Sequence, residues 1–221
     1  MSFEETVKLL KKHANPKNVE GMARFGISSK NTLGVPVYTL RDMAKKIKSD
    51  HTLALKLWKS EIHEARILAS MVDEADKVTE SQMDLWAGDF DSWDVCDQVC
   101  SNLFDKTPYA YKKAAQWPKN KKEFVRRAGF ALMAALAWQD KNAVDNDFRK
   151  FFPIIKKYST DERNFVKKAV NWALRNIGKK RPGLRAEAIE TARELEQTDN
   201  KTARWIAKDA LRELINFGLH K

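Results

Sequence analysis

Trp93 and Asp97 lie four residues apart in the segment DFDSWDVCDQVC. They are an aromatic residue and a carboxylate that could act together on a cation. At this spacing two side chains share one face of a helix. An indole ring attracts cations through its electron-rich face, and a neighbouring carboxylate adds a full negative charge. The pair is therefore suited to stabilise positive charge that develops during a reaction. The alternative is that Asp97 is a solvated helix-surface residue, as most carboxylates are.

The same segment contains Cys96 and Cys100, which share a neighbouring face of that helix. Two sulfurs do not complete a metal site, and His63 is distant in the sequence. We therefore interpret the cysteines as buried packing thiols, with metal binding as the weaker alternative. Nothing suggests a disulfide framework, so we expect a reducing, cytoplasmic location.

Charge divides the chain into two unequal halves. The net charge is +11, yet residues 1–110 carry 15 basic and 17 acidic side chains, whereas residues 111–221 carry 26 and 13. This asymmetry predicts one basic face for a polyanion such as nucleic acid, an acidic lipid surface or an acidic protein; lysine-rich solvated helices are the alternative. The segment 73–105, with ten acidic residues against one lysine, is unexpected beside such a face unless one carboxylate has a chemical role.

Two helical segments of the basic half add further candidates. FVRRAGFALMAAL carries Arg127, which we expect near the solvent end of a mostly buried helix. FVKKAVNWALR places Trp172 among Lys167, Lys168 and Arg175. A tryptophan at this position either packs in the core or stacks on nucleic acid while the flanking cations contact phosphate.

Several other classes of protein are excluded. The four histidines form neither an HxxxH pair nor a triad, and LGVPV lacks the glycine spacing of a phosphate loop. No apolar run approaches 18 residues, and the N-terminus has no signal-peptide stretch. With 43% apolar residues the chain can bury a core, which excludes disorder.

Helical periodicity of apolar residues extends over almost the whole chain. We predict capping residues at Thr39, Thr79, Ser92, Thr160 and Asn200, and an irregular loop over 27–38. The predicted helices cover 3–13, 16–24, 39–48, 52–60, 62–72, 80–87, 93–104, 108–117, 121–138, 144–157, 161–177, 184–195 and 201–217.

The second half also repeats itself. Phe124 and Phe165 are 41 residues apart in related segments, and the Ala-Leu-Arg triplets ending at Arg175 and Arg212 are 37 apart. A period near 40 with paired helices is typical of HEAT and armadillo arrays. We therefore predict an all-α fold: a single domain over 1–221, forming a HEAT-like helical repeat solenoid with a concave basic face.

In their order along the chain, these segments resemble the DNA alkylation repair glycosylases of the AlkD type, which are built of HEAT-like repeats. The resemblance covers nearly the whole chain, from MARFGI and LGVPVYTLRDMAKKI through the Trp-Asp helix to the two repeat helices. Members of that family place a tryptophan and an aspartate four apart, an arginine on a later repeat helix and a second tryptophan on the next. The matching residues here are Trp93, Asp97, Arg127 and Trp172.

The resemblance implies excision of cationic N3- or N7-alkylated purines from duplex DNA, without a cofactor or metal. Asp97, Trp93, Trp172 and Arg127 would be the catalytic residues, with Arg127 holding a phosphate. We expect a monofunctional enzyme, since no lysine stands out as a Schiff-base nucleophile. We also expect a monomer, because a solenoid that embraces DNA needs no partner. The expected DNA-contacting residues are Arg126, Lys167, Lys168, Arg175, Lys179 and Lys180.

Two other functions remain open at this stage. One is a non-catalytic HEAT-repeat module that binds nucleic acid or an acidic protein partner. The other is a scaffold that binds short acidic peptides. Asp97 separates them from the enzyme, because a pure polyanion binder gains nothing from a carboxylate beside Trp93.

Overall fold

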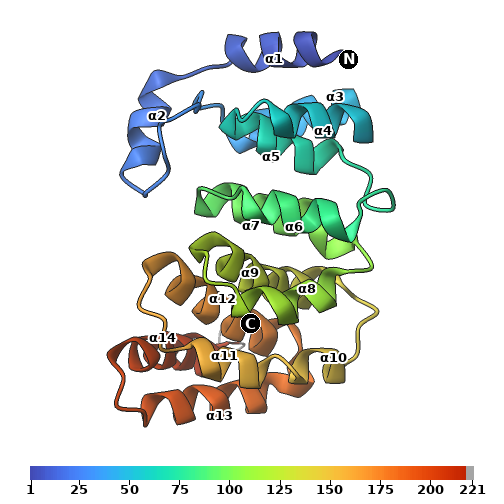
Figure 1. Cartoon of the computed structure of the whole chain (residues 1–221). Coiled ribbons are helices and arrows are strands. Elements are labelled where there is room, and N and C mark those ends of the chain that lie inside the picture. Colours follow the sequence, from blue (N-terminus) through green and yellow to red (C-terminus); the bar gives the residue numbers. More distant parts are fainter. Residues whose placement is uncertain (218–221) are drawn as a thin grey trace. The chain divides into compact units, whose positions relative to one another are not determined.

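The computed structural model describes residues 1–217 and divides into two compact units, which we call unit 1 (Met1–Thr107) and unit 2 (from Pro108 onward). Every regular element of the described residues is helical (Figure 1). Among these elements, none combines the length and apolar character that crossing a membrane requires. The single domain over 1–221 stays a prediction, and each unit is described by itself.

Unit 1 consists of seven α-helices and a short 3-10 helix. Helix α5 packs against α3, α4 and α7, and thereby forms the centre of the unit. Elsewhere in unit 1, the indole rings of Trp58 and Trp86 stack in parallel with ring centroids 4.0 Å apart. The elements are α1 (Phe3–Lys12), α2 (Pro16–Ala23), α3 (Val37–Ile47), α4 (His51–Lys59), α5 (His63–Val72), α6 (Glu80–Gly88), α7 (Trp93–Asn102) and η1 (Phe104–Lys106).

The irregular loop between α2 and α3 is held by one buried carboxylate. Glu64, 1% exposed on α5, accepts backbone N–H bonds from Leu33, Gly34 and Val35 at 2.9, 2.6 and 3.2 Å. Gly34 has a φ of +76°, and a Cβ there would lie 2.2 Å from the carbonyl oxygen of Asn15. Only glycine fits this close approach. The loop therefore has a defined conformation although it contains no regular structure.

Polar side chains in unit 1 link neighbouring elements at a common spacing. Three such hydrogen bonds join residues 31 positions apart. The three pairs are Leu33 with Glu64, Trp58 with Asp89, and His63 with Asp94.

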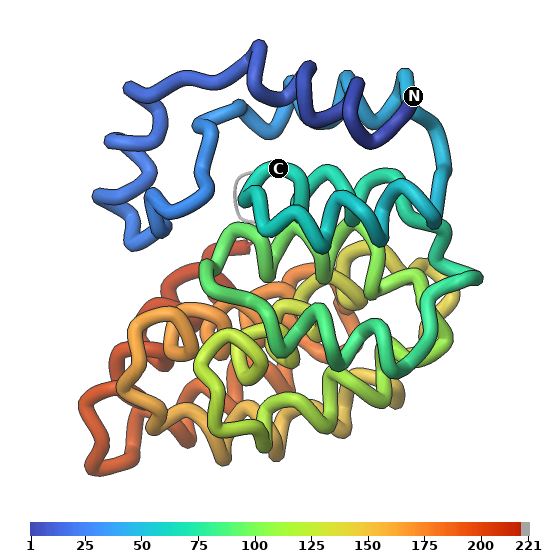
Figure 2. The backbone as a smooth tube through the Cα atoms, turned by 45° about the horizontal axis from the view of Figure 1, so that its top comes forward, coloured from blue at the N-terminus to red at the C-terminus, as the bar shows by residue number. Residues whose placement is uncertain are grey.

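Unit 2 is built around three long helices. Helix α12 packs against both α9 and α14. Figure 2 shows the path of the chain through these helices. The rings of Phe124 and Phe165 lie 5.5 Å apart, so equivalent positions of the predicted repeat contact one another. The elements are α8 (Ala110–Gln116), η2 (Trp117–Lys119), α9 (Glu123–Gln139), α10 (Asp145–Arg149), α11 (Phe152–Tyr158), α12 (Asn164–Lys180), η3 (Pro182–Leu184), α13 (Arg185–Glu196) and α14 (Lys201–Asn216).

A ladder of side-chain bonds in unit 2 repeats every 38 residues. The ladder confirms the predicted period near 40. Several of its bonds also hold basic side chains in contacts within the protein. The six pairs are Arg127 with the Phe165 carbonyl, the Ala143 carbonyl with Arg181, Arg149 with Glu187, Lys156 with Glu194, Asn171 with Asp209, and Arg175 with Glu213.

Most predicted helices are confirmed within a few residues, with one clear error. The predicted helix 144–157 is two helices, α10 and α11, because Pro153 can be accommodated only in the first turn of a helix. The helix predicted over 93–104 ends at Asn102, and η1 follows.

The capping predictions have a mixed outcome. The side chains of Thr79 and Asn200 accept backbone N–H bonds and confirm two predicted caps. Ser92 precedes α7 but makes no such bond. Thr39 and Thr160 were assigned wrongly, since α3 begins two residues before Thr39 and α12 follows Arg163.

Candidate nucleic-acid site

Unit 1 brings Trp93 and Asp97 together on α7, as the spacing predicts. Trp93 is the first residue of the helix, Asp97 follows one turn later, and both are half-buried. The Trp93 Nε1 donates to the carbonyl of Phe25 at 3.1 Å. The indole is therefore held against the turn that follows α2, which restricts the orientation of the ring.

A largely buried contact between His63 and Asp94 orients the start of α7. The Nε2 of His63 lies 2.8 Å from the Asp94 carboxylate, and the Ser92 hydroxyl donates to the same group at 2.6 Å. Burial disfavours the charge on His63, but the hydrogen bond and attraction from Asp94 outweigh it and raise the pKa of the imidazole. Burial likewise opposes the charge on Asp94, yet His63 and Ser92 lower the pKa of this carboxyl. Since Asp94 stands between Trp93 and Asp97, the pair positions both.

The expectation that the acidic segment is mostly solvated is wrong for several residues. The side chain of Asp73 is completely buried and bonds to His51 at 2.6 Å and Gln82 at 2.7 Å. Asp94 is bound as described above. Four of the ten acidic side chains in the segment belong to exposed residues: Asp76, Asp84, Asp89 and Asp91.

Asp105 is a buried carboxylate that sequence analysis did not single out. Among residues 1–217 its Oδ1 has no hydrogen-bond partner. Burial raises the pKa of Asp105 from its ordinary value of 3.8 to about 6, although Lys106 lowers it in part. Between these two pH values the native protein binds a proton that the unfolded chain releases. The contribution of Asp105 to the free energy of unfolding therefore falls as the pH rises from 4 to 6.

Replacing Asp105 by asparagine is expected to raise the free energy of unfolding at pH 7.5 by roughly 2 kcal/mol, because the desolvated charge is removed. At pH 4 the variant and the parent protein should be nearly equally stable. Urea unfolding at both pH values measures the difference. Asp76→Asn, at an exposed position between α5 and α6, is the control and should change neither value. An equal gain at pH 4 and pH 7.5 would contradict this origin of the effect.

Cys96 and Cys100 are both fully buried, which confirms them as packing residues. Burial raises the pKa of the Cys100 thiol, so it stays protonated at neutral pH. Within residues 1–217, no group of three or more His, Cys, Asp or Glu side chains has the arrangement to hold a metal ion.

The predicted position of Arg127 near the solvent end of its helix is wrong. The residue is 6% exposed, and its Nη1 donates to the Phe165 carbonyl at 2.5 Å. Phe165 lies in the first turn of α12. Arg127 therefore joins α9 to the beginning of the helix that carries Trp172.

Three other predicted DNA-contacting residues are held by carboxylates of unit 2. Arg126 pairs with Asp161 at 2.6 Å, and its guanidinium lies 4.7 Å from the ring centre of Tyr158. Arg175 pairs with both Asp209 and Glu213 of α14, and Lys179 pairs with Glu213 at 2.5 Å. These pairs reduce the positive charge that the residues present to a polyanion.

The remaining predicted lysines are more accessible. Lys168 is exposed, and among the described residues it makes no ion pair or hydrogen bond. Lys167 lies 4.8 Å from the ring centre of Trp205, and Lys180 lies 5.9 Å from that of Trp138. Trp172 lies on the same helix and is half-buried, so it is neither a core residue nor a fully exposed one.

Sequence analysis missed Trp138 and Trp205, which are 55% and 41% exposed. Each stands beside a lysine of α12. A signal was available for Trp205, because the apolar stripe of α14 runs through Ile206, Ala207 and Ala210 and leaves Trp205 outside it. Exposed indoles next to cations are typical of surfaces that stack on single-stranded or distorted nucleic acid.

The four predicted catalytic residues thus lie two in each unit. Trp93 and Asp97 share one helix of unit 1, whereas Arg127 and Trp172 lie on contacting helices of unit 2. The lysines of α12 accompany Trp172.

Comparisons with known proteins identify the family of this sequence and fold. The sequence model of a family described as "DNA alkylation repair enzyme" matches residues 6–214. A solved structure described as "a new family of proteins related to the HEAT-like repeat DNA glycosylases with affinity for branched DNA structures" has a TM-score of 0.80 at 21% identity, over 98% of this chain and 97% of the other. The predicted all-α, HEAT-like fold is thereby confirmed. An engineered protein covers 96% of this chain at 14% identity, but its TM-score of 0.40 is too low to carry an argument. No curated protein gave a match.

Proposed function

Because the chain belongs to the DNA alkylation repair enzyme family, we propose that it hydrolyses the N-glycosidic bond of cationic N3- or N7-alkylated purines in duplex DNA. The observation that carries this proposal is the half-buried carboxylate of Asp97, one helical turn after Trp93 and fixed on a helix whose start is clamped by His63 and Asp94. Family membership supports a role in DNA repair, and the Trp-Asp pair supports the reaction.

The reaction requires little acid-base chemistry from the protein. An alkylated purine that is already cationic leaves as a neutral base, so no general acid has to protonate it. Positive charge develops instead on the deoxyribose, as in the oxocarbenium-like transition state of other glycosidases. A carboxylate about 4 Å away at an effective dielectric constant of about 20 stabilises a full charge by ~4 kcal/mol. Partial charge development still corresponds to about 10²–10³ in rate.

Asp97 would stabilise the sugar cation and orient the attacking water. Trp93 would offer its ring face to the charged nucleotide, and its hydrogen bond to Phe25 keeps that face in one orientation. Trp172 would offer its indole ring to DNA from α12 of unit 2. For Arg127, burial and the bond to Phe165 favour a positioning role for α12 over direct contact with phosphate.

The DNA backbone would be bound mainly by the accessible cations of α12. Lys168 and Lys180 are exposed, and Lys167 is paired with an indole, not with a carboxylate. Arg126, Arg175 and Lys179 would contribute less, since carboxylates already neutralise them; an arginine nonetheless retains further N–H donors for phosphate.

The test is to incubate the protein with duplex DNA methylated at guanine N7 and adenine N3, and to separate free bases by chromatography. Release of 7-methylguanine or 3-methyladenine above the spontaneous rate is the expected result. The same DNA should retain intact strands until alkali or an abasic-site nuclease is added, as for a monofunctional glycosylase. Binding to DNA without any base release would reject the enzymatic proposal.

A second candidate function is non-catalytic binding of branched DNA. It is favoured by the affinity for branched DNA in the description of the structurally similar protein, and by the exposed Trp138 and Trp205 beside lysines of α12. It is tested by comparing the affinity for a four-way junction with that for a linear duplex of equal length. A large preference for the junction, together with no base release, would favour this second function.

A further inference from the structure

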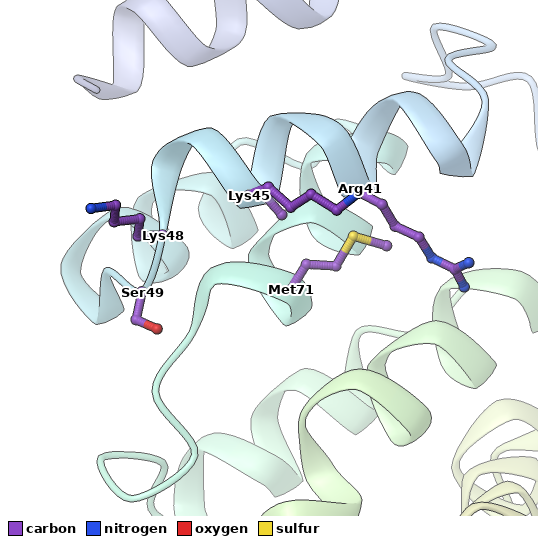
Figure 3. Close-up of a pocket in the computed structure, with 6 residues that line it drawn as sticks. Arg41, Lys45, Lys48, Ser49 and Met71 are labelled. Atoms are coloured by element: carbon purple, nitrogen blue, oxygen red, sulfur yellow. The ribbon is translucent and has the colours of Figure 1, made fainter.

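A cationic groove occurs in unit 1, the half of the protein without excess positive charge. It has a volume of about 400 Å³ and is lined by residues of α3, of the turn that follows it and of the end of α5 (Figure 3). The six lining residues are Arg41, Ala44, Lys45, Lys48, Ser49 and Met71. Three of the six are cations, whereas residues 1–110 as a whole carry more acidic than basic side chains.

The cations of the groove are available to a ligand. Among the described residues, Arg41 and Lys48 have no hydrogen-bond or ion-pair partner for their side chains. Within residues 1–217, Lys45 pairs only with Asp42, at 3.2 Å, and both side chains are well exposed. Exposed pairs of this kind are weak and are readily replaced by a phosphate. The groove therefore contrasts with α12, where carboxylates of α14 hold Arg175 and Lys179.

Helix stability alone does not explain these residues. Lysines in the last turn of a helix interact favourably with its C-terminal carbonyl groups, which would account for Lys45. Arg41 lies in the first half of α3 and gains nothing from that end. Lys48 has a φ of +65°, in the left-handed region that favours glycine, and nevertheless carries a cation at the rim of the groove.

We propose that this groove binds a phosphodiester backbone of DNA, as a contact separate from the residues assigned to base excision. Arg41 and Lys45 lie one turn apart on α3, and Lys48 is the residue that ends this helix, so three cations border the same groove. Three cations at one groove suit successive phosphates of a strand better than one isolated anion. Ala44 and Met71 form an apolar lining against which a deoxyribose can pack, and the Ser49 hydroxyl can donate to phosphate.

The choice of DNA as the polyanion rests on the proposed function, whereas the site itself rests on the groove. An anionic membrane surface fits less well, because stable membrane binding needs projecting apolar groups as well as cations. The apolar groups here, Ala44 and Met71, are half-buried and line the groove.

The first test is the triple variant Arg41→Gln, Lys45→Gln, Lys48→Gln. A matched control is Lys8→Gln, Lys11→Gln, Lys12→Gln, which removes the same charge from exposed positions of α1 in the same unit. Affinity for an unmodified duplex is measured over a range of salt concentrations. The groove variant should bind about tenfold or more weakly at low salt, with the slope of log K against log salt reduced by about 2–3. The control should lose less than about one unit of slope; equal losses in the two variants would overturn the proposal.

The second test localises the contact without removing charge. Ser49→Cys provides an exposed thiol for a photoactivatable azidophenacyl group, and the buried Cys96 and Cys100 should not react. Irradiation should attach this position to the duplex, whereas the same label at Lys8→Cys should not. Absence of attachment at position 49, with DNA binding intact, would overturn the proposal, as would binding to phosphatidylserine vesicles that depends on Arg41, Lys45 and Lys48 while DNA binding does not.

Base release separates the two proposals. At subsaturating methylated DNA, the groove variant should release alkylpurine more slowly than the parent protein by about the factor by which its affinity for DNA is reduced. A different outcome is that the parent protein releases no base while the salt dependence of DNA binding is reduced in the groove variant and not in the control. In that case the proposed enzymatic function fails and the groove proposal stands.

Discussion

Asp97→Asn is expected to slow the release of 7-methylguanine from methylated duplex DNA by a factor of about 10²–10³. Asparagine has nearly the same shape as aspartate but lacks the negative charge that stabilises a cationic sugar. Affinity for DNA should stay within about threefold or improve, since one charge that repels phosphate is removed. Single-turnover rates of base release and equilibrium binding to the same duplex measure the two effects separately.

Asp76→Asn is the matched control for this experiment. It makes the same chemical change in the same acidic segment, at an exposed position outside α7. Its rate of base release should equal that of the parent protein. If Asp97→Asn retains full activity, or if both variants lose activity equally, the assigned role of Asp97 is wrong.

Glu64→Ala is expected to destabilise unit 1 by on the order of 3–5 kcal/mol. The substitution leaves the N–H groups of Leu33, Gly34 and Val35 without their acceptor, two of them in buried surroundings. A buried donor without a partner costs about 1–3 kcal/mol. Urea unfolding followed by tryptophan fluorescence measures the loss, because Trp58, Trp86 and Trp93 all lie in this unit.

Glu64→Gln should lose less stability than Glu64→Ala, since the amide oxygen still accepts one or two of these bonds. Glu20→Ala, at an exposed position of α2, is the control and should change stability by less than about 0.5 kcal/mol. A loss below about 1 kcal/mol for Glu64→Ala would mean that the loop does not depend on this carboxylate.

The helices were predictable because their signals are local. Apolar periodicity and the caps at Thr79 and Asn200 depend on residues within one or two turns. Pro153 marks the division between α10 and α11 in the sequence, but the predicted helix 144–157 runs across it. The repeat near 40 residues was detectable because equivalent helices pack with similar side chains, such as Phe124 and Phe165.

The state of the basic residues was not predictable from local sequence. Whether an arginine is buried, paired or free depends on partners that the fold supplies from a distance. Arg127 is buried because a backbone carbonyl 38 residues later accepts its bond. Arg175 is neutralised by Glu213, also 38 residues away. Likewise, in the sequence Asp94 is only one member of an acidic segment. The fold brings His63 beside it. Net charge therefore overestimates the free cations of unit 2.

The 38-residue ladder also has a consequence for how unit 2 opens. Its bonds join each helical repeat only to the next one along the chain, so coupling within the unit is between nearest neighbours. Helix α12 has neighbours on both sides, whereas α14, the last described helix, packs mainly on α12 and α13. Thermal opening should therefore begin as fraying at α14 and advance inward one repeat at a time. Loss of α14 would release Arg175 and Lys179 from their carboxylates and so convert neutralised side chains into free cations on α12.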